Sequence, residues 1–389
     1  MVGGSHQDLE LPAPTSGLER LERNSIMKKH LWALDLASLV LLFPSFVSSA
    51  TPLTIDDVTK TDPVAYLNRA LDEMQSRALR RATVDWPRIR AEALERAANA
   101  KTTTDTYDAI RFALASLGDH HSSLHLTADL EKLESERKAR HGNRQGSEST
   151  QGDFGPFVGR YGPEGRAEKF GGKTFALLVV TKCFPEDDRQ FRAFETNLQK
   201  IVADLDRTRP SGWVVDLRGN VGGNMWPMLA GVGPVLGEGD DLGEFFTTDG
   251  HSVWRYRDGV AAEVENGKTD SYPAVDGVPY KLAVPSHVAV LIDRGTGSSG
   301  EAIAIAFRGR PHTRFFGEHT SGASTVNETY ALPDGAALWL TIGVQADRTG
   351  KQYPNGLAPD DPIPGGNKIL PDDQDRTLQA ALQWLNGLQ

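Results

Sequence analysis

The stretch "HVAVLIDRGTGSSGEAIAIAF" (residues 287–307) combines an apolar run, a glycine-rich turn and a helical pattern in immediate succession. The apolar run is typical of a buried strand. Ser298 and Glu301 form the Ser-x-x-Glu pattern of a capping box, in which both side chains satisfy free N–H groups at the start of a helix. The same helix start favours developing negative charge, as a nucleophile would need. Ser298 and Ser299 are therefore either parts of a helix cap or candidates for a nucleophile.

A second stretch of the same kind, "GWVVDLRGNVGG" (residues 212–223), also runs from a buried strand into glycines. Strands and helices alternate from about residue 172 to the C-terminus, which predicts an α/β core with its site at the carboxyl ends of the strands. Other strands are predicted within 173–181 and 312–322, helices within 188–209 and 374–388, and a β-hairpin within 329–350.

The sequences of the two glycine turns argue against a nucleotide-binding loop and against the nucleophile elbow of an α/β-hydrolase. Neither turn has the Gly-Lys-Ser/Thr ending of a P-loop or the spacing of a dinucleotide fingerprint. Thr296 stands where the nucleophile elbow of an α/β-hydrolase has its first glycine, and only His312 and His319 follow the serines, at short range. Glycine also lets backbone N–H groups approach a ligand closely, as an oxyanion hole requires.

The N-terminal part of the chain predicts export. From Met27 a basic start is followed by an apolar segment and by small residues up to Ala50, which is the layout of a secretory signal peptide. The apolar segment is short and is interrupted by Asp35 and Pro44, which disfavours a membrane span. We therefore expect Met27 to be the initiator, with residues 1–26 a misassigned start or a disordered extension.

Composition narrows the class of protein further. The chain has 389 residues, of which 39% are hydrophobic and 24% charged, as in a globular protein with a sizeable core. Its formal net charge of −10 argues against nucleic acid as the main partner. Cys183 is the single cysteine, so an intramolecular disulfide and a cysteine-rich metal site are both excluded, and we expect a structural thiol there.

Residues 62–117 have the apolar spacing of about three helices, with Asp62 as a cap and Pro63 in the first turn. The motif "LGDHHSSLHL" (residues 117–126) follows, where a loop could present an imidazole base. Residues 131–153 show no sustained apolar period, which predicts a mobile loop. A metal site formed by the three histidines of the motif is the competing interpretation, but adjacent histidines chelate poorly.

Together these motifs resemble peptidase family S41, which includes the C-terminal processing proteases and the tricorn core protease. The resemblance rests on "LGDHHSSLHL", "GWVVDLRGNVGG", "GTGSSGEAIAIAF", "RFFGEHTSGAST" and "YPNGLAPDDPI", in this order. It implies an α/β fold with a crotonase/ClpP-like ββα spiral core and an N-terminal helical subdomain. The segment between the histidine motif and the core is too short for a PDZ domain.

Matched by position, the resemblance implies that Ser298 is the nucleophile and that the N–H of Ser299, with that of Gly222 or Gly223, forms the oxyanion hole. Ala323 stands where the Ser/Lys branch of the family has its lysine, so a Ser–Lys dyad is not available. The histidine motif instead resembles the tricorn-like branch, which assigns the base to His121. The acid that would orient this histidine is left open among Asp119, Glu301 and Asp360.

The sequence thus predicts a secreted or periplasmic serine peptidase that acts on peptides or proteins, needs no cofactor or metal, and has no stable membrane span once the signal is cleaved. A non-catalytic module that binds apolar ligands on the same fold and an exported esterase are the alternatives. An acyl-CoA enzyme is disfavoured because coenzyme A is cytoplasmic. The predicted division is an extension (1–26), a signal peptide (27–50), a helical subdomain carrying the histidine motif (51–130), a loop or linker (131–171) and the catalytic core (172–389).

Overall fold

The computed structural model describes residues 61–140, 162–282, 286–365 and 374–388. One sheet has six strands in the order β13-β10-β9-β4-β3-β2, and its central pairs are parallel, as the strand–helix alternation predicts. These strands are β2 (Glu164–Phe170), β3 (Lys173–Val179), β4 (Trp213–Asp216), β9 (Val288–Ile292), β10 (Thr313–Gly317) and β13 (Asp361–Pro362).

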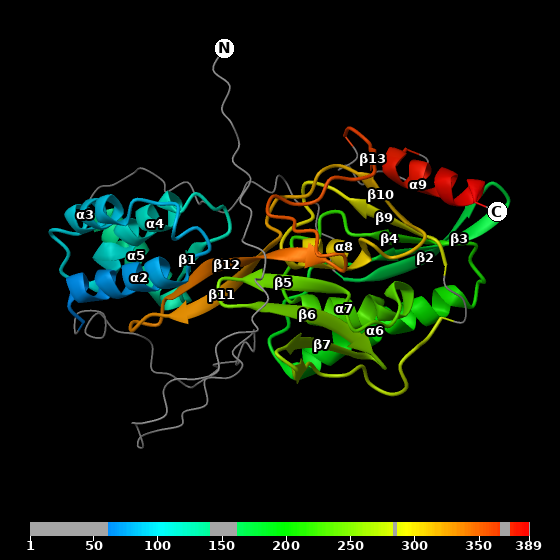
Figure 1. Cartoon of the computed structure of the whole chain (residues 1–389), viewed down its shortest axis with the longest axis horizontal. Helices are drawn as coiled ribbons and strands as arrows, with labels where there is room; N and C mark the ends of the chain where they lie inside the picture. Colours follow the sequence, from blue (N-terminus) through cyan, green and yellow to red (C-terminus); the bar gives the residue numbers. More distant parts are fainter. Residues whose placement is uncertain (1–60, 141–161, 283–285, 366–373, 389) are drawn as a thin grey trace, which may run out of the picture. The chain divides into compact units, whose positions relative to one another are not determined.

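Helices cover both faces of this sheet (Figure 1). One face packs against α6 (Asp188–Asp206), α7 (Met225–Leu236) and α8 (Ser299–Phe307). The other face packs against α9 (Arg376–Gly387). Strand β9, "VAVLI", is buried at every position because alternate side chains enter the two cores.

A second, antiparallel sheet has seven strands, ordered β1-β12-β5-β6-β7-β8 with β11 on the other side of β12. Its strands are β1 (Ser123–His125), β5 (Gly243–Thr247), β6 (His251–Arg257), β7 (Val260–Glu265), β8 (Lys268–Ser271), β11 (Thr325–Ala331) and β12 (Ala337–Asp347). The predicted hairpin is therefore present as β11 and β12. Strands β5 to β8 and helix α7, which contains Pro234 and two glycines, were not predicted.

The expected N-terminal helices are α2 (Pro63–Arg77), α3 (Trp86–Arg96) and α4 (Tyr107–Ser116), with the short 3₁₀ helix η1 (Thr103–Thr106) before α4. Asp62 caps α2 as predicted, since its carboxylate accepts the N–H groups of Val64 and Ala65. Leu338 and Leu340 of β12 belong to the same buried cluster as these helices. The helical region therefore completes its core with the hairpin.

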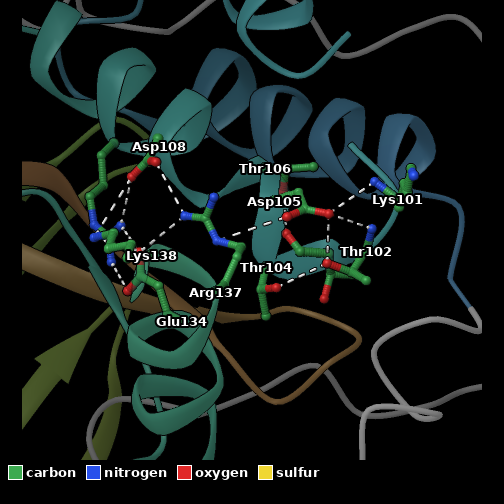
Figure 2. Close-up of polar contacts among 11 residues, drawn as sticks. Lys101, Thr102, Thr104, Asp105, Thr106, Asp108, Glu134, Arg137 and Lys138 are labelled. Atoms are coloured by element: carbon green, nitrogen blue, oxygen red, sulfur yellow. Dashed lines mark hydrogen bonds and ion pairs between the residues drawn. The ribbon is translucent and has the colours of Figure 1, made fainter. Parts of the chain in front are cut away.

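The expectation of a loop over residues 131–171 was wrong in two places. Helix α5 (Ala128–Arg140) extends ten residues into it, and β2 occupies its end. Figure 2 shows charged side chains that join α5 to α4 and η1. Glu134 binds the guanidinium of Arg111 at 2.5 and 2.9 Å, and Arg137 lies 3.2 Å from Asp108. The remaining residues expected as loop, 141–161, lie outside the described residues.

Strand β2 was missed because it is an edge strand with a mostly exposed, polar sequence, "EGRAEKF". It pairs along its whole length with β3, the strand expected at the start of the core. The expected signal peptide and the segment before it lie outside the described residues. Over the stretches that the structure describes, no helix is both long and apolar enough to cross a membrane.

Candidate active site

The two glycine turns after β4 and β9 touch each other. Since these strands are parallel neighbours, their carboxyl ends lie at the same edge of the sheet. Gly222 has a φ of +106°. A Cβ added to it would lie 2.9 Å from the Cβ of Ser298 and also 2.9 Å from the backbone nitrogen of Ser299. The N–H of Gly297 donates to the carbonyl of Asn220 at 2.9 Å. The structure thus brings the two predicted turns together as one unit.

A buried ion cluster fixes the start of the first turn. Arg218 is held between Asp216, the last residue of β4, and Asp375, the N-cap of α9, through contacts of 2.7 to 3.0 Å. Burying one arginine between two carboxylates is favourable only when all three are paired in good geometry. The cluster therefore ties the turn to α9, which nothing in the local sequence pattern predicted.

Ser298 has a strained backbone at the N-cap of α8. Its φ is +51° and its ψ is −118°, a conformation that a residue with a Cβ adopts only at a cost of about 1–3 kcal/mol. Its side chain is partly exposed, whereas Ser299 is buried and donates its hydroxyl to the carbonyl of Gly223 at 2.5 Å. Of the two serines, Ser298 is therefore the one whose side chain faces accessible space.

Glu301 holds this strained backbone in place. The Ser298 N–H donates to Glu301 Oε2 at 2.9 Å, which is the backbone half of the predicted capping box. Three further donors reach the same carboxylate: the hydroxyls of Thr320 (2.5 Å) and Ser321 (3.3 Å) and the N–H of Gly322 (3.0 Å). Burial raises the pKa of Glu301, although these hydrogen bonds oppose the shift. Among the described residues, every hydrogen-bond donor to this carboxylate is a backbone N–H or a hydroxyl, and none is an imidazole.

The backbone N–H groups around the two turns differ in whether they already have an acceptor. The N–H of Gly222 is already taken, since it donates to Asn220 Oδ1 at 3.0 Å. Cys183 pairs with the residues on either side of Gly223: its N–H donates to Gly222 and its carbonyl accepts from Asn224. The Gly223 N–H consequently points away from Cys183, and neither it nor the Ser299 N–H has an acceptor among the described residues.

The histidine motif is held by polar side chains on β11 and β12. Asp119 Oδ1 accepts the N–H groups of His121 (3.1 Å) and Ser122 (2.6 Å), and its Oδ2 accepts the Ser122 hydroxyl at 2.9 Å. Asp119 therefore shapes the turn rather than contacting the imidazole. The imidazole Nδ1 lies 2.7 Å from Thr325 Oγ1 instead, and Asn327 Nδ2 donates to the His121 carbonyl.

The other carboxyl candidate for orienting His121 is also occupied. Asp360 pairs with Arg308 at 2.7 Å and accepts the N–H of Phe315 at 2.8 Å. Burial lowers the pKa of His121 to about 4, and the charge of Asp119 only partly opposes this. The imidazole is therefore neutral at physiological pH, with a hydroxyl and not a carboxylate at Nδ1.

One short segment links the two halves of the site. Ser321 donates its N–H to Thr296 in the serine turn, and Gly322 binds Glu301. Three residues further on, Thr325 contacts the imidazole of His121. Within the described residues no hydrogen bond joins His121 to Ser298, and the segment from Ser321 to Thr325 is what connects their surroundings.

The metal interpretation of the histidine motif finds no support in the geometry. His125 stacks on Trp339 with ring centroids 3.6 Å apart, and its Nε2 bonds the Ser123 hydroxyl, while His120 is exposed. Among the described residues no group of three or more histidine, cysteine, aspartate or glutamate side chains could hold a metal ion. Burial raises the pKa of the Cys183 thiol to about 12, as expected for a structural cysteine.

Sequence relatives of this chain include two groups. A nisin-resistance protein of Lactococcus lactis subsp. lactis is 28% identical over 84% of this chain and 87% of its own length. A carboxyl-terminal-processing protease of Picosynechococcus is 26% identical over 49% of this chain, and the match spans 42% of that protein.

Solved structures agree on the fold. A lipoprotein from Streptococcus agalactiae superimposes with a TM-score of 0.57 at 23% identity, covering 84% of this chain and 96% of that one. The photosystem II D1 C-terminal processing protease gives a TM-score of 0.55 at 16% identity, covering 82% and 97%. The predicted α/β fold of the crotonase/ClpP type is thereby confirmed. The family model for peptidase family S41 matches residues 166–363, just over half of the chain, and the chain therefore belongs to peptidase family S41.

Proposed function

We propose that this chain is an exported serine peptidase in which Ser298 is the nucleophile and His121 the general base. The observation that carries the proposal is the strained N-cap of α8. A buried glutamate holds Ser298 at a positive φ where its turn packs against Gly222, and the N–H groups of the next residues, Gly223 and Ser299, have no acceptor among the described residues. Strain of this kind persists only where the surroundings enforce it, and it is concentrated at functional sites.

In the proposed reaction the Nδ1–H of His121 donates to Thr325 Oγ1, which leaves Nε2 as the base. Nε2 takes the proton of the Ser298 hydroxyl as Oγ attacks the scissile carbonyl carbon. The N–H groups of Gly223 and Ser299 bind the oxyanion that forms. The imidazolium then donates its proton to the leaving amine, and water hydrolyses the acyl-enzyme with the same base.

A low histidine pKa has two opposing consequences for this role. It keeps the ring neutral over the whole physiological range, ready to accept the serine proton, but it also makes the ring a weaker base. The imidazolium formed in the transition state then lies near Asp119, whose charge favours the protonated ring. A serine–histidine contact that is long in the free enzyme and tightens with bound substrate is common in hydrolases, which accounts for the missing hydrogen bond to Ser298.

Export and substrate follow from two further arguments. Residues 27–50 have the layout of a signal peptide, and one structural neighbour is described as a lipoprotein. The relative that matches over most of the chain is named for nisin resistance, and other relatives for carboxyl-terminal processing. A peptidase that cleaved nisin outside the cytoplasm would give such resistance, so nisin is the first substrate to assay.

The direct test is acylation by a fluorophosphonate probe. We expect the wild-type protein to be labelled and Ser298→Ala not to be, with Ser76→Ala on the exposed face of α2 as the matched control that keeps its label. Mass spectrometry of nisin incubated with the same three proteins tests the substrate. Labelling that persists in Ser298→Ala would refute the nucleophile, and turnover of esters but not of peptides would restrict the enzyme to an esterase.

A further inference from the structure

Phe184 is an exposed aromatic residue at the edge of the site. Its side chain is 56% exposed, and among the described residues only Val64 (46%) and Val278 (95%) are other large hydrophobic side chains in the exposed class. It follows Cys183 directly, in the connection between β3 and α6. Leaving a phenylalanine ring in water is unfavourable by about 25 cal/mol for each Å² of apolar surface. Phe184 nevertheless lies exposed next to the glycine turn that contains Gly223, which raises the question of what the ring binds there.

The ring lies beside Gly223. A Cβ added to Gly223 would be 3.2 Å from Phe184 Cδ1 and 2.0 Å from the Cys183 carbonyl oxygen. The backbone of Cys183 is bonded on both sides of Gly223, at 3.1 Å to the Gly222 carbonyl and at 2.7 Å from the Asn224 N–H. Phe184 is therefore placed by the same hydrogen bonds that shape the proposed oxyanion hole.

The loop is also fixed at its other end. Asp187 caps α6 by accepting the N–H of Gln190 at 2.7 Å, and Gln190 Oε1 accepts the N–H of Glu186 at 3.0 Å. Pro185 stands between these contacts and Phe184 and restricts the backbone further. The exposed ring is thus carried by a short loop held at both ends, which is the arrangement of a preformed binding surface.

We infer that Phe184 determines specificity: it packs against the substrate side chain that flanks the scissile bond and selects an apolar one. This inference rests on the proposed function. An oxyanion bound by the Gly223 N–H lies about 3 Å from that nitrogen, so a residue next to the scissile carbonyl passes the ring. An aliphatic or aromatic side chain there buries apolar surface on Phe184, whereas a carboxylate would lose hydration against the ring.

The test compares pairs of fluorogenic peptides that differ only in leucine or aspartate at each position flanking the scissile bond. In the wild type we expect leucine to be preferred at one of these positions. Phe184→Ala should lower kcat/KM for that leucine peptide about tenfold while leaving the aspartate peptide within about twofold, so that the preference is lost. Phe184→Leu should keep most of the preference, and Val278→Ala should behave as wild type.

The outcomes separate this inference from the proposed function. If Phe184→Ala still reacts with the fluorophosphonate probe but keeps the wild-type leucine preference, the specificity role is wrong and the peptidase proposal stands. An equal loss for both peptides likewise contradicts selection by the ring. If the fluorophosphonate probe still labels Ser298→Ala, the proposed function fails, whatever peptide preference Phe184→Ala shows.

Discussion

The serine turn and the histidine loop are built in different ways. The serine turn is made of backbone: it packs against Gly222, which has a positive φ in the neighbouring turn, and a buried glutamate accepts the N–H groups of Ser298 and Gly322. The histidine loop is made of side-chain hydrogen bonds, from Asp119 within the loop and from Thr325, Asn327 and Thr341 on the hairpin. The serine turn therefore depends on the absence of a Cβ at a glycine. The histidine loop depends on the presence of particular side-chain hydroxyl, carboxylate and amide groups.

This difference teaches which substitutions each half tolerates. A turn packed at backbone distance cannot accept any larger residue, however similar its chemistry. A loop held by hydrogen bonds can accept a neighbour that keeps the acceptor or donor in place. The serine turn should therefore respond to added volume, and the histidine loop to the loss of a specific polar atom.

The largest effect is expected for Gly222→Ala. A Cβ there would meet the Gly297 carbonyl, the Ser298 Cβ and the Ser299 N, all at 2.9 Å, and alanine also resists a φ of +106°. We expect the two turns to separate, with kcat/KM reduced by about 100-fold or more as the oxyanion donors are displaced, and a loss of about 1–3 kcal/mol in the free energy of unfolding. Peptide turnover and urea unfolding measure the two effects.

Gly267 supplies the matched control for that substitution. It also has a positive φ, +80°, in the turn between β7 and β8, but a Cβ there meets nothing within 4 Å. Gly267→Ala should therefore cost about 1 kcal/mol of stability and leave turnover unchanged. Equal losses of activity in both variants would mean that strain, and not contact between the two turns, explains the result.

A smaller effect is expected for Thr325→Val, which keeps the shape of the side chain and removes the hydroxyl next to His121 Nδ1. Without this acceptor the ring is free to adopt the wrong tautomer or orientation, so kcat should fall about tenfold with KM nearly unchanged. Thr325→Ser restores the hydroxyl and should recover most of the rate. A purely structural role would instead lower thermal stability in the valine variant without this split between kcat and KM.

Sequence patterns predicted the backbone half of the site better than the side-chain half. The buried strands and their glycines are local signals, and the turn containing Ser298 follows from them. The partner of the His121 ring was missed because Thr325 lies 204 residues away and has no distinctive pattern of its own. Helix α5 was missed for a related reason: among its described residues only Leu130 and Leu133 pack into the apolar cluster, and its other contacts are ion pairs to α4 and η1, which apolar periodicity does not register.

Asp119 shows where a motif assigns the right residue but leaves its role open. The sequence placed an acid two residues before the histidine, which suited a catalytic triad as well as a turn. The structure shows both of its oxygens on the N–H groups of His121 and Ser122 and on the Ser122 hydroxyl. A carboxylate that faces a ring nitrogen of His121 would orient the base, whereas one that faces backbone nitrogens shapes the turn. Spacing in the sequence does not determine which of these the carboxylate faces.

The smallest effect is therefore expected for Asp119→Asn, although in a triad it would be among the largest. The asparagine oxygen can still accept the two N–H groups of the loop, so kcat/KM at pH 7 should stay within about threefold of wild type. An aspartate that oriented the imidazole would lose about 10⁴-fold on the same change. A loss of that size would mean that Asp119, and not Thr325, orients the imidazole of His121.

The pH profile of the same variant tests the electrostatics of the loop independently of its geometry. The base acts only when neutral, so wild-type kcat/KM should fall as the pH drops through the His121 pKa, about 4, and not near the usual value of about 6.5. Asp119 raises that pKa by its charge. Removing the charge disfavours the imidazolium, so the acid limb of Asp119→Asn should move to still lower pH. A limb that stays near pH 6.5 in both proteins would mean that His121 is solvated in the working enzyme, and that the hairpin encloses it less than the free structure shows.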